Sequence, residues 1–227
     1  MDETSRLLES ISIILSALTW PGLLIFILVR FGPELREFLR SLGEFTLKGP
    51  GFEASAKRQQ VEATAALVAA TASRPANEQG PSTANVAKEA VKLVQEEVTP
   101  RLLRKASRSL ILWVDDHPEN NIYERQSLEA LGIEFILART TEDAIERSQP
   151  GKFVAIISDM GRPSDPRAGY TLLEKLRASG DQTPYIIYTG SNSAGRRAEA
   201  RKQGALGSTN RPQELFEYVL QALRSDV

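Results

Sequence analysis

Three aspartates follow apolar segments and could together carry out phosphoryl chemistry. Asp115 and Asp116 come directly after the run SLILWV, and Asp159 comes after FVAIIS. Three carboxylates brought together repel one another, so such a cluster costs free energy unless a cation neutralises it. Carboxylate oxygens suit a hard divalent ion, and Mg²⁺ with retained waters fits two or three of them. Asp159 beside such an ion could attack phosphorus and form an acyl phosphate.

A hydroxyl and a cation follow the two remaining apolar runs. Thr189 ends PYIIYT, and Arg211 comes after the weaker run ALGST. Helical patterns separate these runs, so the chain from Ser109 alternates strand and helix five times, which argues for a parallel sheet with helices on both faces. In such doubly wound folds, sites form beyond the carboxyl ends of the strands. We therefore expect the acids, the hydroxyl and the cation to meet at one edge, where the last two could hold phosphoryl oxygens.

These segments together resemble the receiver domain of two-component response regulators. The motifs ILWVDDHPEN, AIISDMGRP, TPYIIYTGS and GALGSTNRPQEL appear in the family's order. The spacing also fits, with 43 residues from Asp116 to Asp159, 30 more to Thr189 and 22 more to Arg211. The resemblance covers about half of the chain, which we delimit as residues 108–227. It implies a doubly wound, five-stranded parallel sheet of the flavodoxin-like kind.

The resemblance also assigns roles. It implies that Asp159 is the phosphoacceptor and that Asp115 and Asp116 hold Mg²⁺ with it. The backbone carbonyl of Gly161 would be a further metal ligand, and Thr189 would be the switch hydroxyl. The implied partner is a sensor histidine kinase or another phosphodonor protein, and the implied activity is phosphorelay signalling and not enzymatic turnover of a substrate. Since the sequence ends shortly after the last helical pattern, we expect output through protein contacts.

Three departures from the family pattern leave alternatives open. Arg211 stands where the family has a lysine, and a guanidinium is larger and planar, so it could instead pair with an acid on the last helix. Ser208 replaces an aromatic switch residue, and the loop from Asp159 to Gly169 is about two residues longer than usual. A pseudo-receiver, which keeps the fold without phosphotransfer, is therefore the alternative. A phosphohydrolase of the haloacid-dehalogenase kind is disfavoured, because that family needs an aspartate where Gly161 stands.

Composition restricts the other chemistries. The 227 residues include no cysteine and one histidine, His117. Disulfides, thiolate metal sites, cysteine nucleophiles and multi-histidine clusters are therefore excluded. The net charge of -1 gives no general attraction to nucleic acid, so we expect no nucleic-acid partner.

An apolar run near the start predicts a membrane anchor over residues 1–45. Ser10 to Val29 is 20 residues without a charge, long enough for a transmembrane helix at about 10–30, with Pro21 in its middle. A cleaved signal peptide is the weaker alternative, because the preceding residues are not basic, and a buried core helix lacks an apolar partner nearby. Residues 33–42 predict an amphipathic juxtamembrane helix.

Basic residues set the expected orientation. Arg30, Arg36, Arg40 and Lys48 follow the apolar run, whereas Arg6 alone precedes it. The positive-inside rule then predicts a single-pass protein of the inner or plasma membrane with its C-terminal domain in the cytoplasm.

Residues 46–107 predict a connecting region. Two short strands are expected around Gly49-Pro50-Gly51, then an alanine-rich helix over 53–73 and a flexible linker over 74–85. Valines recur at helical spacing from Val86 to Val98. They could pair two protomers as a short coil, giving a homo-oligomer through the N-terminal helices, or lie on the neighbouring domain.

Overall fold

The computed structural model describes residues 51–73, 83–190 and 193–225. Its C-terminal part is built on a five-stranded sheet in the order β2-β1-β3-β4-β5, and all four strand pairs are parallel. The strands are β1 (Leu110–Val114), β2 (Glu134–Ala138), β3 (Ala155–Ser158), β4 (Tyr185–Tyr188) and β5 (Gly207–Thr209). The predicted five-stranded parallel sheet is confirmed.

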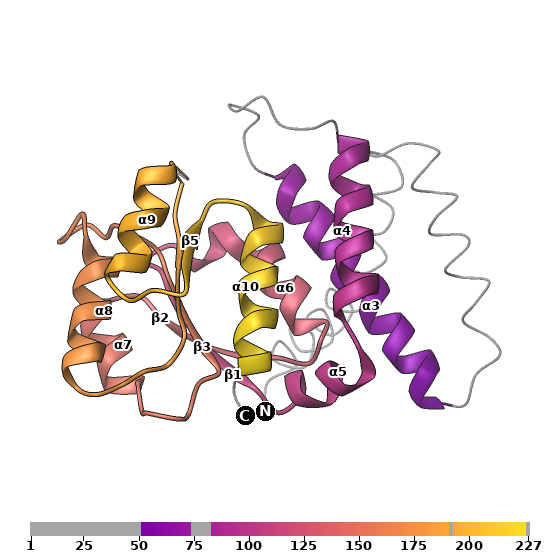
Figure 1. Ribbon diagram of the computed structural model, residues 1–227, viewed down its shortest axis with the longest axis horizontal. Helices are drawn as coiled ribbons and strands as arrows, with labels where there is room; N and C mark the ends of the chain where they lie inside the picture. Colours follow the sequence, from indigo (N-terminus) through magenta and orange to yellow (C-terminus); the bar gives the residue numbers. More distant parts are fainter. Residues whose placement is uncertain (1–50, 74–82, 191–192, 226–227) are drawn as a thin grey trace, which may run out of the picture.

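Helices cover both faces of this sheet (Figure 1). The connecting elements are η1 (Pro118–Asn121), α6 (Ile122–Glu129), α7 (Thr141–Arg147), α8 (Ala168–Ala178), α9 (Ala194–Lys202) and α10 (Pro212–Ser225). Successive strand side chains point to opposite faces. In β1, Ile111 and Trp113 join the apolar cluster of α6 and α10, whereas Leu112 and Val114 join that of α7, α8 and α9. Burial on both faces explains why SLILWV is continuously apolar.

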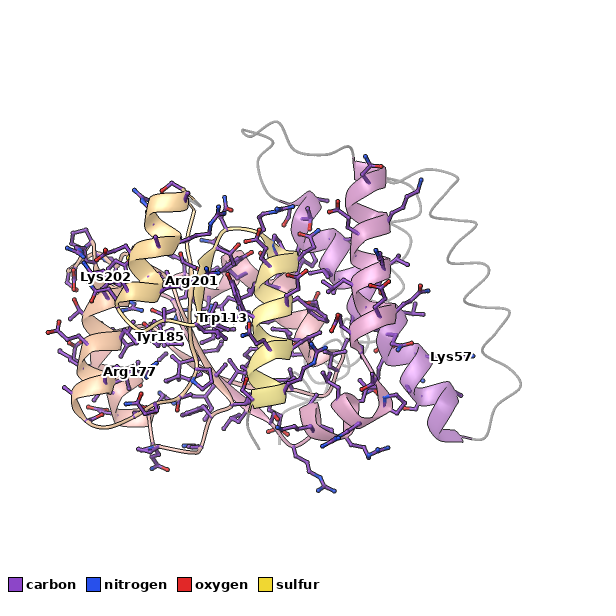
Figure 2. The ribbon with its side chains drawn as sticks, in the orientation of Figure 1. Lys57, Trp113, Arg177, Tyr185, Arg201 and Lys202 are labelled. Carbon is purple, nitrogen blue, oxygen red and sulfur yellow. The ribbon has the colours of Figure 1, made fainter. Side chains whose placement is uncertain are left out.

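The interior of the domain is filled by large side chains from the central strands. Trp113 from β1 and Tyr185 from β4 are both fully buried, and Figure 2 shows them within the body of the domain. Phe135 and Tyr188 lie edge-on to the Trp113 ring, with centroids 6.0 and 6.1 Å away. Such packing fixes the central strands, whose ends carry the predicted acids.

Three further helices precede the sheet and pack on its α6/α10 side. They are α3 (Gly51–Ala72), α4 (Thr83–Glu97) and α5 (Pro100–Ala106). Figure 1 shows α3 and α4 beyond α6 and α10, on the side away from the sheet. Leu67 of α3 and Val94 of α4 belong to the same buried cluster as Phe216 of α10. Gln213 on α10 also donates to the Thr71 hydroxyl at 2.8 Å.

This packing corrects part of the connecting-region prediction. Residues 51–72 form one helix, so the strand predicted after the Gly-Pro-Gly turn is wrong. The reason is that the turn residues are followed by good helix formers whose alanines then bury against α6. The alanine-rich helix itself was predicted correctly. The described helices of 46–107 share a core with the sheet and are more than a connector.

The two alternatives for the valines are also decided. Val94 and Val98 are buried inside the chain, so the helix lies on its neighbouring domain. Thr99 caps the next helix by accepting from the Leu102 N–H at 3.3 Å, and Pro100 occupies its first turn. The apolar face that could have paired two protomers is covered within the protomer.

Several N-terminal predictions lie outside the described residues. These are the transmembrane helix at about 10–30, the juxtamembrane helix at 33–42, the first strand of the hairpin and most of the linker at 74–85. Within the part of the chain that the structure describes, no helix combines the length and the apolar character needed to cross a membrane.

Candidate functional site

The three predicted acids meet where β1 and β3 end. The two strands are neighbours with Val114 opposite Ser158, so Asp115 and Asp116 emerge beside Asp159. One carboxylate oxygen from each aspartate lies within 4.8 Å of the others. The parallel pairing therefore brings together residues that are 43 positions apart in the sequence.

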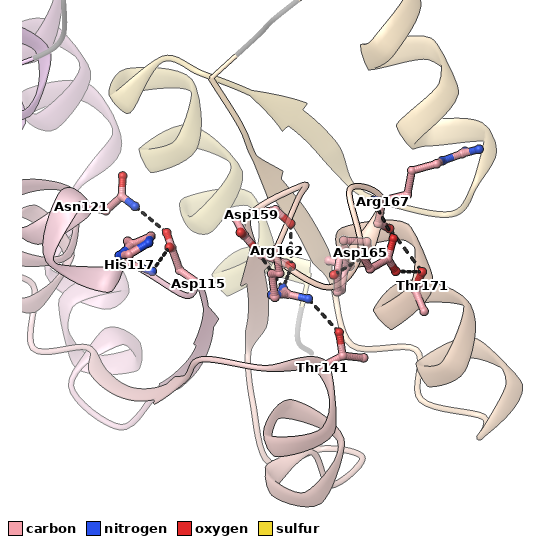
Figure 3. Close-up of polar contacts among 12 residues, drawn as sticks. Asp115, His117, Asn121, Thr141, Asp159, Arg162, Asp165, Arg167 and Thr171 are labelled. Atoms are coloured by element: carbon pink, nitrogen blue, oxygen red, sulfur yellow. Dashed lines mark hydrogen bonds and ion pairs between the residues drawn. The ribbon is translucent and has the colours of Figure 1, made fainter.

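Asp115 is buried and its carboxylate is fixed by two donors. The His117 N–H donates to Oδ1 at 2.8 Å, and the Asn121 amide donates to Oδ2 at 2.7 Å (Figure 3). Asp116 is more accessible, and the ring of the exposed His117 lies 3.5 Å from its Oδ2. One acid is thus held rigidly while the next one faces the opening of the site.

Asp159 carries the strongest electrostatic perturbation of the cluster. Burial above all, together with the neighbouring Asp115 and Asp116, raises the pKa of its carboxyl to about 7, against the lowering effect of Arg162. A carboxyl group with such a pKa needs additional positive charge to stay fully ionised at neutral pH. Three hard oxygen donors within reach of one another fit a divalent ion such as Mg²⁺.

Arg162 lies beside Asp159 and was not singled out by the sequence. Its Nη2 is 2.8 Å from Asp159 Oδ1 and donates to the Ser158 hydroxyl at 2.6 Å. Its Nη1 donates to the Thr141 hydroxyl at 2.9 Å (Figure 3). The side chain is 3% exposed. An arginine in a proline-containing loop is ordinarily a solvated charge, so nothing in the sequence indicates that this one is buried.

The long loop after Asp159 is closed by its own hydrogen bonds. Arg162 and Asp165 exchange two backbone bonds of 2.9 and 3.0 Å. The Asp165 carboxylate accepts from the Arg167 N–H at 2.8 Å and from the Thr171 hydroxyl at 2.6 Å (Figure 3). Gly161 lies in this loop, directly before Arg162, and is exposed. The extra loop length thus forms a compact turn that returns the chain to α8.

Gly169 permits that return. Its N–H donates to the Met160 carbonyl at 2.9 Å. A Cβ at position 169 would lie 2.5 Å from the Asp159 carbonyl oxygen, which is closer than real contacts allow. The glycine therefore lets α8 begin directly against the backbone of Asp159.

The remaining predicted residues lie beyond β4 and β5. The Thr189 N–H donates to the Thr209 carbonyl at 3.0 Å, which places Thr189 at the end of β4. Arg211 Nη1 pairs with Glu214 Oε1 at 3.1 Å, and the arginine side chain is 52% exposed. No hydrogen bond or ion pair among the described residues joins Arg211 to the three aspartates. Ser208 is buried, and its hydroxyl has no hydrogen-bond partner within the described residues.

A comparison with known protein families agrees with this fold and this acid cluster. Residues 111–219 match the response regulator receiver domain family, and this part of the chain is a receiver domain of two-component signalling. No curated protein matches the chain.

Solved receiver domains resemble the same half of the chain. The receiver domain of the Francisella response regulator 1452 is 23% identical over 52% of this chain and 99% of its own, with a TM-score of 0.45. A CheY-like receiver domain protein from Methanospirillum hungatei is 25% identical over 52% and 95%, with a TM-score of 0.45. The non-phosphorylated HemR receiver domain from Leptospira biflexa is 20% identical over 51% and 94%, also with a TM-score of 0.45.

Proposed function

We propose that this chain accepts a phosphoryl group on Asp159. The observation that carries the proposal is the convergence of Asp115, Asp116 and Asp159 within 4.8 Å where β1 and β3 end. A carboxylate oxygen of Asp159 attacks the phosphorus of a phosphohistidine, or of a small acyl phosphate. With phosphohistidine, the new P–O bond forms as the P–N bond breaks; the imidazole leaves with that electron pair and takes up a proton from solvent. With a small acyl phosphate, the P–O bond to the acyl group breaks and the carboxylate leaves with that electron pair.

Asp115, Asp116 and Asp159 would hold Mg²⁺ at this site, with the Gly161 carbonyl as a further ligand. The ion would supply positive charge that offsets the charge of the incoming phosphoryl group. The His117 N–H and the Asn121 amide hold the Asp115 carboxylate in one orientation, which favours a fixed donor set. Asp116, at the accessible side, leaves room for retained waters.

The proposed role is signalling and not catalysis of a substrate's turnover. A sensor histidine kinase or a comparable phosphodonor protein would supply the phosphoryl group. Thr189 would act as the switch hydroxyl that responds to phosphorylation, and output would pass through protein contacts. The helices α3 and α4 add surface for such contacts, because they enlarge the domain on the α6/α10 side.

We further propose that residues 10–30 anchor the protein in a membrane, with the receiver domain in the cytoplasm. Support comes from the uncharged run of 20 residues and from the basic residues that follow it. The test is fractionation of cells, followed by protease treatment of spheroplasts. Sedimentation with membranes and protection of the receiver domain are expected; digestion from outside would overturn the orientation.

Incubation of the full chain with acetyl phosphate and Mg²⁺, followed by intact-mass measurement, tests the acceptor function. The wild-type chain should gain one phosphoryl group, and Asp159→Asn should gain none. A wild-type chain that gains no phosphoryl group from acetyl phosphate or from a phosphohistidine donor would overturn the proposal in favour of a pseudo-receiver.

A further inference from the structure

The acid cluster contains a cation of its own. Arg162 reaches Asp159 from the loop that follows it, with Nη2 at 2.8 Å from Oδ1. We propose that Arg162 is the resident counter-ion of the phosphoacceptor and competes with Mg²⁺ for Asp159, so that the metal binds more weakly than three carboxylates alone would hold it. The inference rests on the proposed function, since it concerns the same site.

Contacts other than Asp159 hold the guanidinium in place. The Ser158 hydroxyl accepts from Nη2 at 2.6 Å, and the Thr141 hydroxyl accepts from Nη1 at 2.9 Å. These partners come from the end of β3 and the start of α7, and Figure 3 shows Arg162 between Asp159 and Thr141. The backbone of Arg162 is bound to Asp165 in both directions. The positive charge therefore stays beside the acceptor even when Asp159 turns toward another ligand.

Burial makes this charge effective. The Arg162 side chain is 3% exposed and that of Asp159 is 15% exposed, so water screens their interaction weakly. A divalent cation bound by the three aspartates would lie close to the guanidinium and be repelled by it. It would also have to share Asp159 with it. Both effects lower the affinity for metal.

Arg211, the other candidate cation, would not lower the affinity for metal in this way. Arg211 is half-exposed and pairs with Glu214 on α10, the helix that follows it. Its charge is screened by solvent and offset by a neighbouring carboxylate. The cation that contacts the acceptor in this structure is thus the one on the loop after β3.

Calorimetric titration of Mg²⁺ into the full chain at pH 8, purified in mild detergent, tests the inference. Arg162→Gln removes the charge and keeps an N–H donor for one of the two hydroxyls. We expect it to bind Mg²⁺ roughly tenfold more tightly or better than the wild type. Arg162→Lys keeps the charge and should stay within about threefold of the wild type, by the same electrostatic argument.

Arg167→Gln is the matched control. Arg167 belongs to the same loop, is exposed, and lies over the Tyr170 ring at 5.2 Å, without a contact to the aspartates in the described structure. Its substitution should leave the affinity for Mg²⁺ unchanged. An equal gain in both glutamine variants would mean that only the net charge of the loop matters, and would overturn a specific role for Arg162.

The outcomes separate the inference from the proposed function. If the wild type gains a phosphoryl group on Asp159 but Arg162→Gln binds Mg²⁺ no more tightly, the inference alone is wrong. If neither protein binds Mg²⁺, both proposals are wrong. Should Arg162→Gln not fold, the arginine side-chain N–H signals of the wild type give the answer in a magnetic resonance titration with Mg²⁺. Arg162 signals must shift and Arg167 signals must not; unshifted Arg162 signals would overturn the inference.

Discussion

The residues that follow the strands form a rim at one edge of the sheet. The half of this rim beyond β1 and β3 differs from the half beyond β4 and β5 in how the side chains are held. Beyond β1 and β3, Asp115, Asp159 and Arg162 are largely buried, and each has a fixed partner. Beyond β5, Arg211 extends along the surface to Glu214. The acceptor half is therefore organised before any ligand arrives. In the half that the resemblance associates with switching, neither Thr189 nor Arg211 makes a hydrogen bond or ion pair to Asp159 among the described residues. Phosphoryl uptake and the response to it should be separable by mutation.

The largest expected effect lies in the acceptor half, at Asp116. Removing one carboxylate from a site within 4.8 Å of two others should weaken Mg²⁺ binding by on the order of a hundredfold, because a doubly charged ion loses a close negative charge. Calorimetry on Asp116→Ala measures this loss. Glu119→Ala, an exposed acid near the same rim, is the control and should change the affinity little. Equal affinities in wild type and Asp116→Ala would place the metal elsewhere.

Gly169→Ala tests the close packing of α8 against the backbone of Asp159. The new methyl group would meet the Asp159 carbonyl at 2.5 Å, so we expect a destabilisation of about 1–3 kcal/mol in urea unfolding. Phosphoryl uptake should fall as well, because α8 would push on Asp159. Gly195→Ala is the matched control, since a Cβ there meets nothing within 4 Å and its helix should tolerate alanine. Equal stability of the two variants would refute the close contact.

In the absence of divalent ions, Asp159→Asn should increase the free energy of unfolding, and only at higher pH. The pKa of Asp159 is raised to about 7 in the folded protein from a usual value of 3.8. A raised folded pKa gives stability that is fully present below pH 4 and is lost as the pH rises through 7. Asparagine has no such loss, so the variant should gain about 1–2 kcal/mol at pH 8, allowing for solvent screening, and nothing at pH 4. Thermal unfolding at both values without divalent ions measures it. A gain that is the same at pH 4 and pH 8 would contradict the charge argument.

The smallest effect is expected on the other side of the rim. Arg211→Gln removes an exposed ion pair, which contributes under about 1 kcal/mol, and should change phosphoryl uptake by less than about threefold. Uptake from acetyl phosphate under the conditions used for the wild type provides the comparison. Loss of uptake in this variant would show that Arg211 moves to the acceptor as the family's lysine would, and that the two halves are not separable.

The strands and the meeting of the three acids could be predicted from the sequence, because the course of the backbone alone decides them. Continuous apolar runs predicted buried parallel strands, and acids directly after two of them had to emerge at one edge. Asp115, Asp116 and Asp159 were therefore placed together correctly. The glycine at 169 was noted only as the end of a long loop, since its contact with Asp159 depends on how that loop folds back.

Side-chain directions and the packing partners of the helices could not be predicted from the sequence. Nothing in MGRPSDPRAG distinguishes the buried Arg162 from the exposed Arg167, because the difference arises from the hydroxyls of Ser158 and Thr141 in other elements. Helices over 53–73 and 86–98 were expected, but their contact with α6 and α10 was decided only by tertiary packing. The strand expected after Gly49-Pro50-Gly51 was wrong, because the residues from Gly51 onward form a helix.

Locating the acyl phosphate chemically tests whether Asp159 is the phosphoacceptor. The full chain is treated with acetyl phosphate and Mg²⁺ and then reduced with borohydride, which converts an aspartyl phosphate to homoserine. Peptide mapping by mass spectrometry then identifies the modified position. We expect homoserine at position 159 in the wild type and in Arg211→Gln, and none in Asp159→Asn. Homoserine at position 115 or 116, or an unchanged level of modification in Asp159→Asn, would contradict it.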